Sequence, residues 1–155
     1  MAGRPAAEVH EQKPFEKVEE EAVFNLVRTA EVLNQKSTDY FRHFDLSRTQ
    51  YNVLRILRGA GDDGLTCSAT AGRMVNRDPD VTRLMDRMET RGLITRERTA
   101  SDRRIVLIRL TKAGRDLVDS LDHGVSAFHA KLVGRIGAAK LRKLIDLLEE
   151  VREQC

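Results

Sequence analysis

Two neighbouring stretches decide the fold: residues 78–94, DPDVTRLMDRMETRGLI, and residues 101–114, SDRRIVLIRLTKAG. The first opens with Asp78, a favoured helix N-cap, and Pro79, which suits the first position of a helix. Four apolar residues then recur at the i, i+3, i+4 and i+7 spacing of one helical face: Val81, Leu84, Met85 and Met88. This stretch therefore predicts an amphipathic helix that stops where Gly92 follows it.

The second stretch belongs to a predicted β-hairpin. Residues 93–98 and 104–110 are rich in β-branched and apolar side chains, and residues 99–102 between them have a turn composition. Thr111 is a favoured N-cap for a long helix that continues to about residue 134. The apolar pattern thus changes from helical to strand-like and back within a short part of the chain.

Further helices are predicted on both sides of these stretches. A long helix is expected over 15–44, a second after the capping box of Ser47 and Gln50, and a short third capped by Thr66. A last helix from about residue 138 carries one apolar stripe: Leu141, Leu144, Ile145, Leu148 and Val151. The predicted fold is mainly α with a small β-hairpin wing, in the order of a winged helix-turn-helix.

The overall composition is that of one soluble domain. A chain of 155 residues is long enough for a single buried core, and it has no apolar run that would span a membrane. Residues 1–13 lack the apolar segment of an export signal, and we expect them to be disordered. Cys67 and Cys155 form no disulfide or metal-binding pattern, which fits a reducing compartment. We therefore expect a cytoplasmic protein.

The distribution of charge indicates an anionic partner. Residues 66–115 carry twelve Lys and Arg against six Asp and Glu, a net charge of +6, whereas the whole chain carries only +3. A basic segment between slightly acidic ends is typical of nucleic-acid binding. No Phe, Tyr or Trp occurs in the same segment. Because single-stranded nucleic acids are usually bound by stacking on aromatic rings, duplex DNA is the expected partner.

The helix that begins at Asp78 is the expected recognition helix, since the second helix of a helix-turn-helix enters the major groove. Arg83 is the best candidate for a base contact, because a guanidinium can donate two hydrogen bonds to guanine. Asp80 and Thr82 are weaker candidates, and Arg87 lies on the same polar face. Further candidates for phosphate contacts precede the helix: Arg73 and Arg77. In the alternative interpretation these arginines pair with nearby carboxylates, namely Asp78, Asp86 and Glu89.

The hairpin supplies a second group of candidate DNA contacts. An arginine at the tip of a β-ribbon suits the narrow and electronegative minor groove. Asp102 is well placed to hold one arginine in a fixed pose. The arginines of this group lie on the incoming strand and at the tip: Arg96, Arg98, Arg103 and Arg104.

The two opening stretches resemble the MarR family of bacterial transcription regulators. The most specific features are a recognition helix that ends in Arg-Gly-Leu-Ile, and an Asp-x-Arg that leads through a strand to Leu-Thr-x-x-Gly. On the family pattern the wing arginine is Arg104, with Asp102 as its partner. The short helix departs from the pattern at Thr70 and Gly72, and a glycine inside a helix costs about 1 kcal/mol relative to alanine.

The resemblance also implies an organisation and a way of working. The family consists of homodimers that bind pseudo-palindromic operators and are often released by a small ligand or an oxidant. Residues 1–13 would then be a disordered tail and 14–45 an N-terminal dimerisation helix. Residues 46–111 would be the winged helix-turn-helix DNA-binding lobe, and 112–155 the C-terminal dimerisation helices.

The sequence says little about the signal that such a regulator would sense. A ligand pocket is expected near Phe41, Phe44 and Tyr51, although aromatic residues at helical spacing are more often plain core. Cys67 is expected at a helix N-terminus, so oxidant sensing is an alternative. The spacing of the histidines predicts no metal site, and no cofactor motif is present.

These observations predict a sequence-specific regulator that binds double-stranded DNA, and specifically a ligand-responsive repressor acting as a homodimer. One alternative is a winged-helix module whose basic face meets an acidic protein, and another is a thiol-based redox-sensing regulator. The chain has no Gly-rich phosphate loop, no His-Glu-x-x-His and no nucleophile elbow. We therefore do not expect an enzyme.

Overall fold

The computed structural model describes residues 15–76 and 80–155. It divides into two compact units, residues 1–48 and residues 49–155, which are described separately below. The predicted tail, residues 1–13, lies outside the described residues. None of the helices in the described ranges is both long and apolar enough to cross a membrane.

The first unit is built on one long helix, α1 (Val18–Arg42), close to its predicted range of 15–44. Most of its surface is exposed, and Phe41 is its buried residue. Near its C-terminal end the ring of Tyr40 contacts both Phe41 and Phe44, with centroid distances of 5.2 and 5.3 Å. Arg48 donates a hydrogen bond to the side-chain oxygen of Asn34, which ties the end of this unit back to α1.

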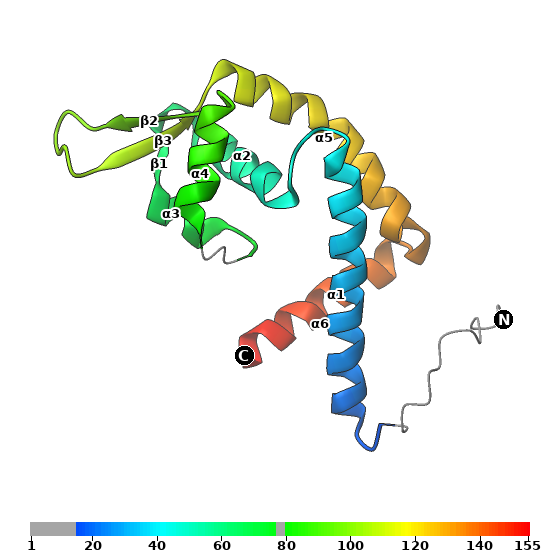
Figure 1. Cartoon of the computed structure of the whole chain (residues 1–155). Helices are drawn as coiled ribbons and strands as arrows, with labels where there is room; N and C mark the ends of the chain where they lie inside the picture. Colours follow the sequence, from blue (N-terminus) through cyan, green and yellow to red (C-terminus); the bar gives the residue numbers. More distant parts are fainter. Residues whose placement is uncertain (1–14, 77–79) are drawn as a thin grey trace. The chain divides into compact units, whose positions relative to one another are not determined.

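The second unit has the element order of a winged helix-turn-helix (Figure 1). Helices α2 (Arg48–Ala60), α3 (Cys67–Arg73) and α4 (Val81–Thr90) come first. The hairpin β2 (Ile94–Arg98) and β3 (Val106–Leu110) follows, and then helices α5 (Lys112–Val133) and α6 (Ala138–Gln154). Two short 3₁₀ turns, Gly61–Asp63 and Gly134–Ile136, lie between helices. The predicted fold class, mainly α with a small β-hairpin wing, is confirmed.

The sheet contains one strand that the sequence did not predict. β1 (Leu65–Thr66) pairs antiparallel with β3, so the sheet order is β1-β3-β2 and β3 is the central strand. The hairpin itself has the register Ile94↔Leu110 to Arg98↔Val106. Gly64 makes the additional pairing feasible, because its φ is +71° and a Cβ there would lie 2.7 Å from the carbonyl oxygen of Ile108.

The core of the second unit forms where the apolar faces of its helices meet the sheet. Of the predicted face of α4, Leu84, Met85 and Met88 are buried and Val81 is half-buried. Apolar residues of α2 are buried as well, and Ile94 and Ile108 contribute one residue from each long strand. The side chains with less than 2% exposure are Val53, Leu54, Leu57, Thr70, Met85, Met88, Ile94, Ile108 and Val118. Thr70 is the polar member, and its hydroxyl donates to the carbonyl oxygen of Thr66, so its burial leaves no unsatisfied donor.

The Leu-Thr-x-x-Gly motif joins the wing to α5. The hydroxyl of Thr111 caps α5 by accepting from the N–H of Gly114, and it also donates to the carbonyl oxygen of Gly92. The N–H of Thr111 donates to the carbonyl oxygen of Leu93. A Cβ on Gly114 would overlap that same Leu93 oxygen, so this position has no room for a side chain. The motif therefore holds the end of α4, the start of the hairpin and the start of α5 in one hydrogen-bonded joint.

The start of the recognition helix differs from its prediction. The helix was expected over 78–91 with Asp78 as its N-cap, but α4 begins at Val81 and Asp80 is its N-cap. The side chain of Asp80 accepts from the N–H of Arg83, which satisfies one of the free donors of the first turn. The end of the helix is as predicted: Gly92 adopts a φ of +69°, and the N–H of Leu93 reaches back to the carbonyl oxygen of Met88.

Candidate nucleic-acid interface

Arg83 lies in the first turn of α4 and is widely exposed, with 73% of its side chain accessible. Its Nε is 3.1 Å from Oδ2 of Asp80, the residue that caps the same helix. Asp80 therefore holds both the backbone and the side chain of Arg83 at the N-terminal end of α4. Exposed ion pairs contribute only about 0–1 kcal/mol. The Arg83 guanidinium can therefore break its ion pair with Asp80 and bind the edge of a base at little cost in free energy.

Thr82 and Arg87 share the outer surface of α4 with Arg83. Both are exposed, and the Nε of Arg87 donates to the carbonyl oxygen of Arg83 at 3.3 Å. The buried residues of the helix, Leu84, Met85 and Met88, face the other way. Thus three of the predicted contacts in α4 lie on one polar surface, and its N-cap Asp80 lies at the end of that surface.

The tip of the wing is organised by hydrogen bonds between Thr99 and Asp102. The Thr99 hydroxyl donates to the carbonyl oxygen of Asp102 at 2.6 Å, and its oxygen accepts from the backbone N–H of Asp102 at 3.2 Å. The N–H of Ile105 donates to the same carbonyl oxygen, and the Ile105 carbonyl accepts from the N–H of Thr99. This network closes the turn. Thr99 is an organising residue that the sequence analysis did not single out, although its spacing of three residues from Asp102 was a usable signal.

Asp102 acts on Arg104 through the backbone. Its Oδ1 accepts from the N–H of Arg104 at 2.9 Å, and within the described ranges no ion pair joins Asp102 to an arginine side chain. Asp102 therefore contacts the backbone of Arg104, and the described residues show no pairing of Asp102 with the Arg104 guanidinium. The side chains of Arg103 and Arg104 are exposed at the tip of the wing.

Arg96 and Arg98 lie on the same strand of the wing but have different surroundings. Arg96 is only 25% exposed, and its Nη2 donates to Oδ1 of Asp86 on α4 at 2.6 Å. Arg98 is exposed, and its side chain has no hydrogen bond or ion pair with the rest of the described chain. The structure thus binds Arg96 to the recognition helix, whereas the side chain of Arg98 is exposed to solvent.

Of the remaining predicted contacts, the structure describes Arg73, which ends α3 and is exposed. Arg77 falls outside the described residues. Val75, which follows α3, is 73% exposed, and its N–H donates to the side-chain oxygen of Asn52 at 3.1 Å. Figure 1 shows α3, α4 and the hairpin gathered at one end of this unit, with the hairpin projecting beyond α4.

The residues considered for sensing differ in exposure. Phe41 and Tyr51 are buried, and Phe44 is 38% exposed. Cys67 is half-buried at the first position of α3, and Cys155 is exposed, with its Sγ 3.2 Å from the carbonyl oxygen of Val151. In the part of the chain that the structure describes, no group of three or more His, Cys, Asp and Glu could hold a metal ion.

The chain matches several known proteins over this region. The family model of the MarR family matches residues 46–106, which run from the start of α2 into the wing. The crystal structure of a MarR transcription factor from Planctomyces limnophilus is 37% identical, with a TM-score of 0.68, over 87% of this chain and 98% of that one. The chain belongs to the MarR family of transcription regulators.

The chain is also similar to one further sequence relative and to one further solved structure. An uncharacterized HTH-type transcriptional regulator of Bacillus subtilis, YdgJ, is 35% identical over 72 residues, which are 46% of this chain and 44% of that protein. The chain therefore matches less than half the length of that relative. A MepR–DNA complex from S. aureus has the same fold, with a TM-score of 0.75 and 24% identity, over 87% of this chain and 97% of that one.

Proposed function

We propose that this MarR-family chain is a sequence-specific regulator that binds double-stranded DNA and represses transcription. The observation that carries the proposal is the joint placement of two cationic elements in one unit. Arg83 stands at the exposed end of α4, while Arg103 and Arg104 stand at the tip of the wing that continues from α4. A helix of this kind fits the major groove, and an arginine-bearing ribbon fits the minor groove beside it. The solved complex of MepR with DNA has the same fold, which supports the proposal.

The first test is fluorescence anisotropy with the duplex upstream of the protein's own gene, and with a scrambled duplex of equal length as the control. A preference for the upstream duplex of about 10³-fold is expected for a sequence-specific regulator. Equal, weak and salt-sensitive binding to both duplexes would count against this operator or against regulation itself. Selection of DNA from the whole genome would then distinguish a different operator from a winged-helix module that binds an acidic protein.

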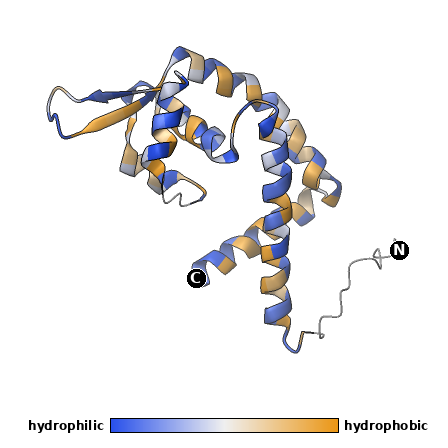
Figure 2. Ribbon diagram, in the orientation of Figure 1, coloured by the Kyte–Doolittle hydropathy of each residue, from blue (hydrophilic) through white to orange (hydrophobic). Residues whose placement is uncertain are grey.

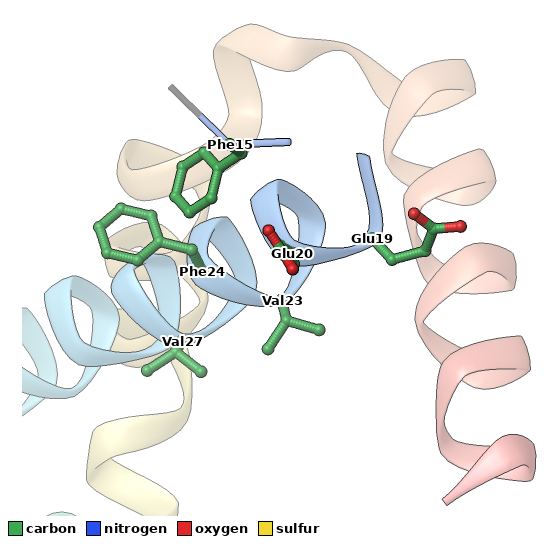
Figure 3. Close-up of a pocket in the computed structure, with 6 residues that line it drawn as sticks. All are labelled: Phe15, Glu19, Glu20, Val23, Phe24 and Val27. Atoms are coloured by element: carbon green, nitrogen blue, oxygen red, sulfur yellow. The ribbon is translucent and has the colours of Figure 1, made fainter. Parts of the chain in front are cut away.

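We further propose that the chain acts as a homodimer on a pseudo-palindromic operator. The support is the apolar surface that α1 and α6 leave exposed in the single chain, whose residues colour parts of both helical ribbons orange (Figure 2). On α1 this surface includes an open recess in which the rings of Phe15 and Phe24 lie 5.3 Å apart (Figure 3). Its lining residues are Phe15, Glu19, Glu20, Val23, Phe24 and Val27. Covering such surfaces with a second copy removes them from water, which contributes about 25 cal/mol per Å² of apolar area before the entropic cost of association is subtracted.

The oligomeric state is tested with charge substitutions in these helices. Val27→Asp on α1 and Ile145→Asp on α6, at 65% and 53% exposure, should leave each chain folded and convert the dimer to monomers in sedimentation velocity. Val75→Asp, at 73% exposure but outside both helices, is the matched control and should remain dimeric. A wild-type monomer at micromolar concentration would contradict the proposal.

Release of the DNA by a small effector is the third part of the proposal. The support is membership of the family, for which the resemblance implies such release, and the aromatic cluster of Tyr40, Phe41 and Phe44 near the end of α1. The same anisotropy experiment tests it: candidate effectors are added to the preformed complex with the upstream duplex. A fall in anisotropy that Tyr40→Ala abolishes, while the variant still binds DNA, would support a site at this cluster. Retained release in that variant would contradict the site.

A further inference from the structure

Arg96 is fixed between two carboxylates of the recognition helix. Its Nη2 donates to Oδ1 of Asp86 at 2.6 Å, and its Nε lies 3.6 Å from Oε2 of Glu89. The same Nη2 is 3.4 Å from the carbonyl oxygen of Thr82, one turn before Asp86. The guanidinium of β2 thus spans about two turns of α4.

The burial of Arg96 separates it from the other arginines of the interface. Its side chain is 25% exposed, against 73% for Arg83, and its Nε is buried without a hydrogen-bond partner. Charge-assisted hydrogen bonds of this length are the stronger ones in proteins, so Arg96 would lose a good contact by turning outward. Its place in the fold is therefore set by α4.

The two carboxylates create an electrostatic problem for DNA binding. Asp86 and Glu89 lie on the exposed side of α4, with side chains 58% and 43% accessible. Near a duplex, both negative charges would be repelled by the phosphates. Arg96 brings a positive charge to them from inside the protein, and its bonds also fix the strand β2 against α4.

We propose that Arg96 is a positioning residue for DNA recognition: it offsets one of the two negative charges of Asp86 and Glu89 and holds the wing against the recognition helix, without itself touching DNA. This inference rests on the proposed function of the chain. It assigns to Arg96 a role that differs from the direct contact predicted from its sequence alone.

The test is a double-variant cycle on operator affinity, measured by anisotropy with the upstream duplex. Arg96→Gln should lower the affinity about tenfold, because it leaves Asp86 uncompensated at the interface. Adding Asp86→Asn should restore the affinity to within about threefold of the wild type, since Glu89 then leaves a local charge of −1, the same as that of Arg96, Asp86 and Glu89 together in the wild type. If Arg96 contacted DNA directly, the added change would not restore the lost contact.

The matched control is Arg98, on the same strand and two residues further along, which has no partner among the described residues. Asp86→Asn in the wild-type background measures the general effect of removing one negative charge on the affinity. In the Arg98→Gln background, Asp86→Asn should change the affinity by no more than this amount.

Three further measurements show whether a negative result reflects misfolding, a wrong proposed function or a wrong role for Arg96. Thermal unfolding should show every variant folded at the assay temperature. Arg96→Lys keeps the positive charge but not the planar fork, so its affinity should lie between that of the wild type and that of Arg96→Gln. An Arg96→Lys affinity no higher than that of Arg96→Gln, or a double variant whose affinity is not restored, would each overturn the inference alone. Equal binding of upstream and scrambled duplex by the wild type would instead overturn the proposed function, and the inference with it.

Discussion

Replacing Gly114 with alanine should destabilise the protein severely although it adds a single methyl group. The new Cβ would overlap the carbonyl oxygen of Leu93 and lie 3.0 Å from its carbonyl carbon and 3.3 Å from Cδ2 of Leu110. Ordinary van der Waals contacts of a Cβ begin at about 3.4 Å, and the nearest neighbours here are backbone atoms that cannot rotate away. The start of α5 must therefore move away from the end of α4.

The magnitude follows from what this movement breaks. Forcing an extra carbon into a packed site costs about 1–3 kcal/mol. The two hydrogen bonds from Thr111, to the carbonyl oxygens of Leu93 and Gly92, contribute about 0.5–1.5 kcal/mol each. Alanine is a better helix former than glycine by up to about 1 kcal/mol, which offsets part of the loss. We expect a net decrease of about 3 kcal/mol in the free energy of unfolding, a large part of the 5–15 kcal/mol typical of a domain.

Urea unfolding followed by circular dichroism measures this change, at one fixed protein concentration because association would shift the midpoint. Gly72→Ala in α3 is the matched control, since a Cβ there meets nothing within 4 Å, and it should stabilise the protein by up to about 1 kcal/mol. A loss below about 1 kcal/mol for Gly114→Ala, or an equal loss for both variants, would refute the steric reasoning.

Three other predictions follow from the interface and from α5. Arg104→Ala should weaken binding to all duplexes alike in anisotropy, because a wing contact in the minor groove is mostly electrostatic. Arg83→Ala should cost about 1–3 kcal/mol of operator binding and relax the preference at one base pair per half-site, as measured with single-base operator variants; wild-type binding by both variants would contradict these assignments. The hydrogen bond from Arg58 holds the pKa of the Asp122 carboxyl below its usual range, so folding favours the ionised form. This stability is complete above the unfolded-state pKa of about 3.9 and is lost as the pH falls through the lower folded-state value. Urea midpoints between pH 2 and pH 6 should therefore fall less steeply for Asp122→Asn than for the wild type, and parallel curves would contradict the coupling.

Local signals predicted much of the second unit. Thr66 and Thr111 cap their helices as expected, because a cap depends on residues only three positions apart. Gly92 likewise ends α4 where its freedom at positive φ is needed. The predicted N-cap of α4, Asp78, was wrong, because Asp78 and Asp80 are equally good capping residues by type. Asp80 also forms an ion pair with Arg83, and the composition of the segment does not reveal this contact.

Contacts between distant residues were beyond the sequence pattern. β1 has only two residues, too few for any periodicity, and its partner β3 lies far along the chain. Arg96 and Arg98 are equivalent in the strand pattern, and only the packing of β2 against α4 distinguishes them. The sequence therefore predicts which side chains are suitable for contacting DNA, and the fold determines which of these side chains are accessible to it.

The joint at Thr111 has a mechanical consequence. It is the single residue between the end of β3 at Leu110 and the start of α5 at Lys112, so no loop is present to absorb a rotation. The 22 residues of α5 form a rod of about 33 Å. A tilt of roughly 5° about this joint would sweep the far end near Val133 through roughly 3 Å. A small sideways displacement at the far end of α5 would therefore change the angle between α5 and the wing at Thr111.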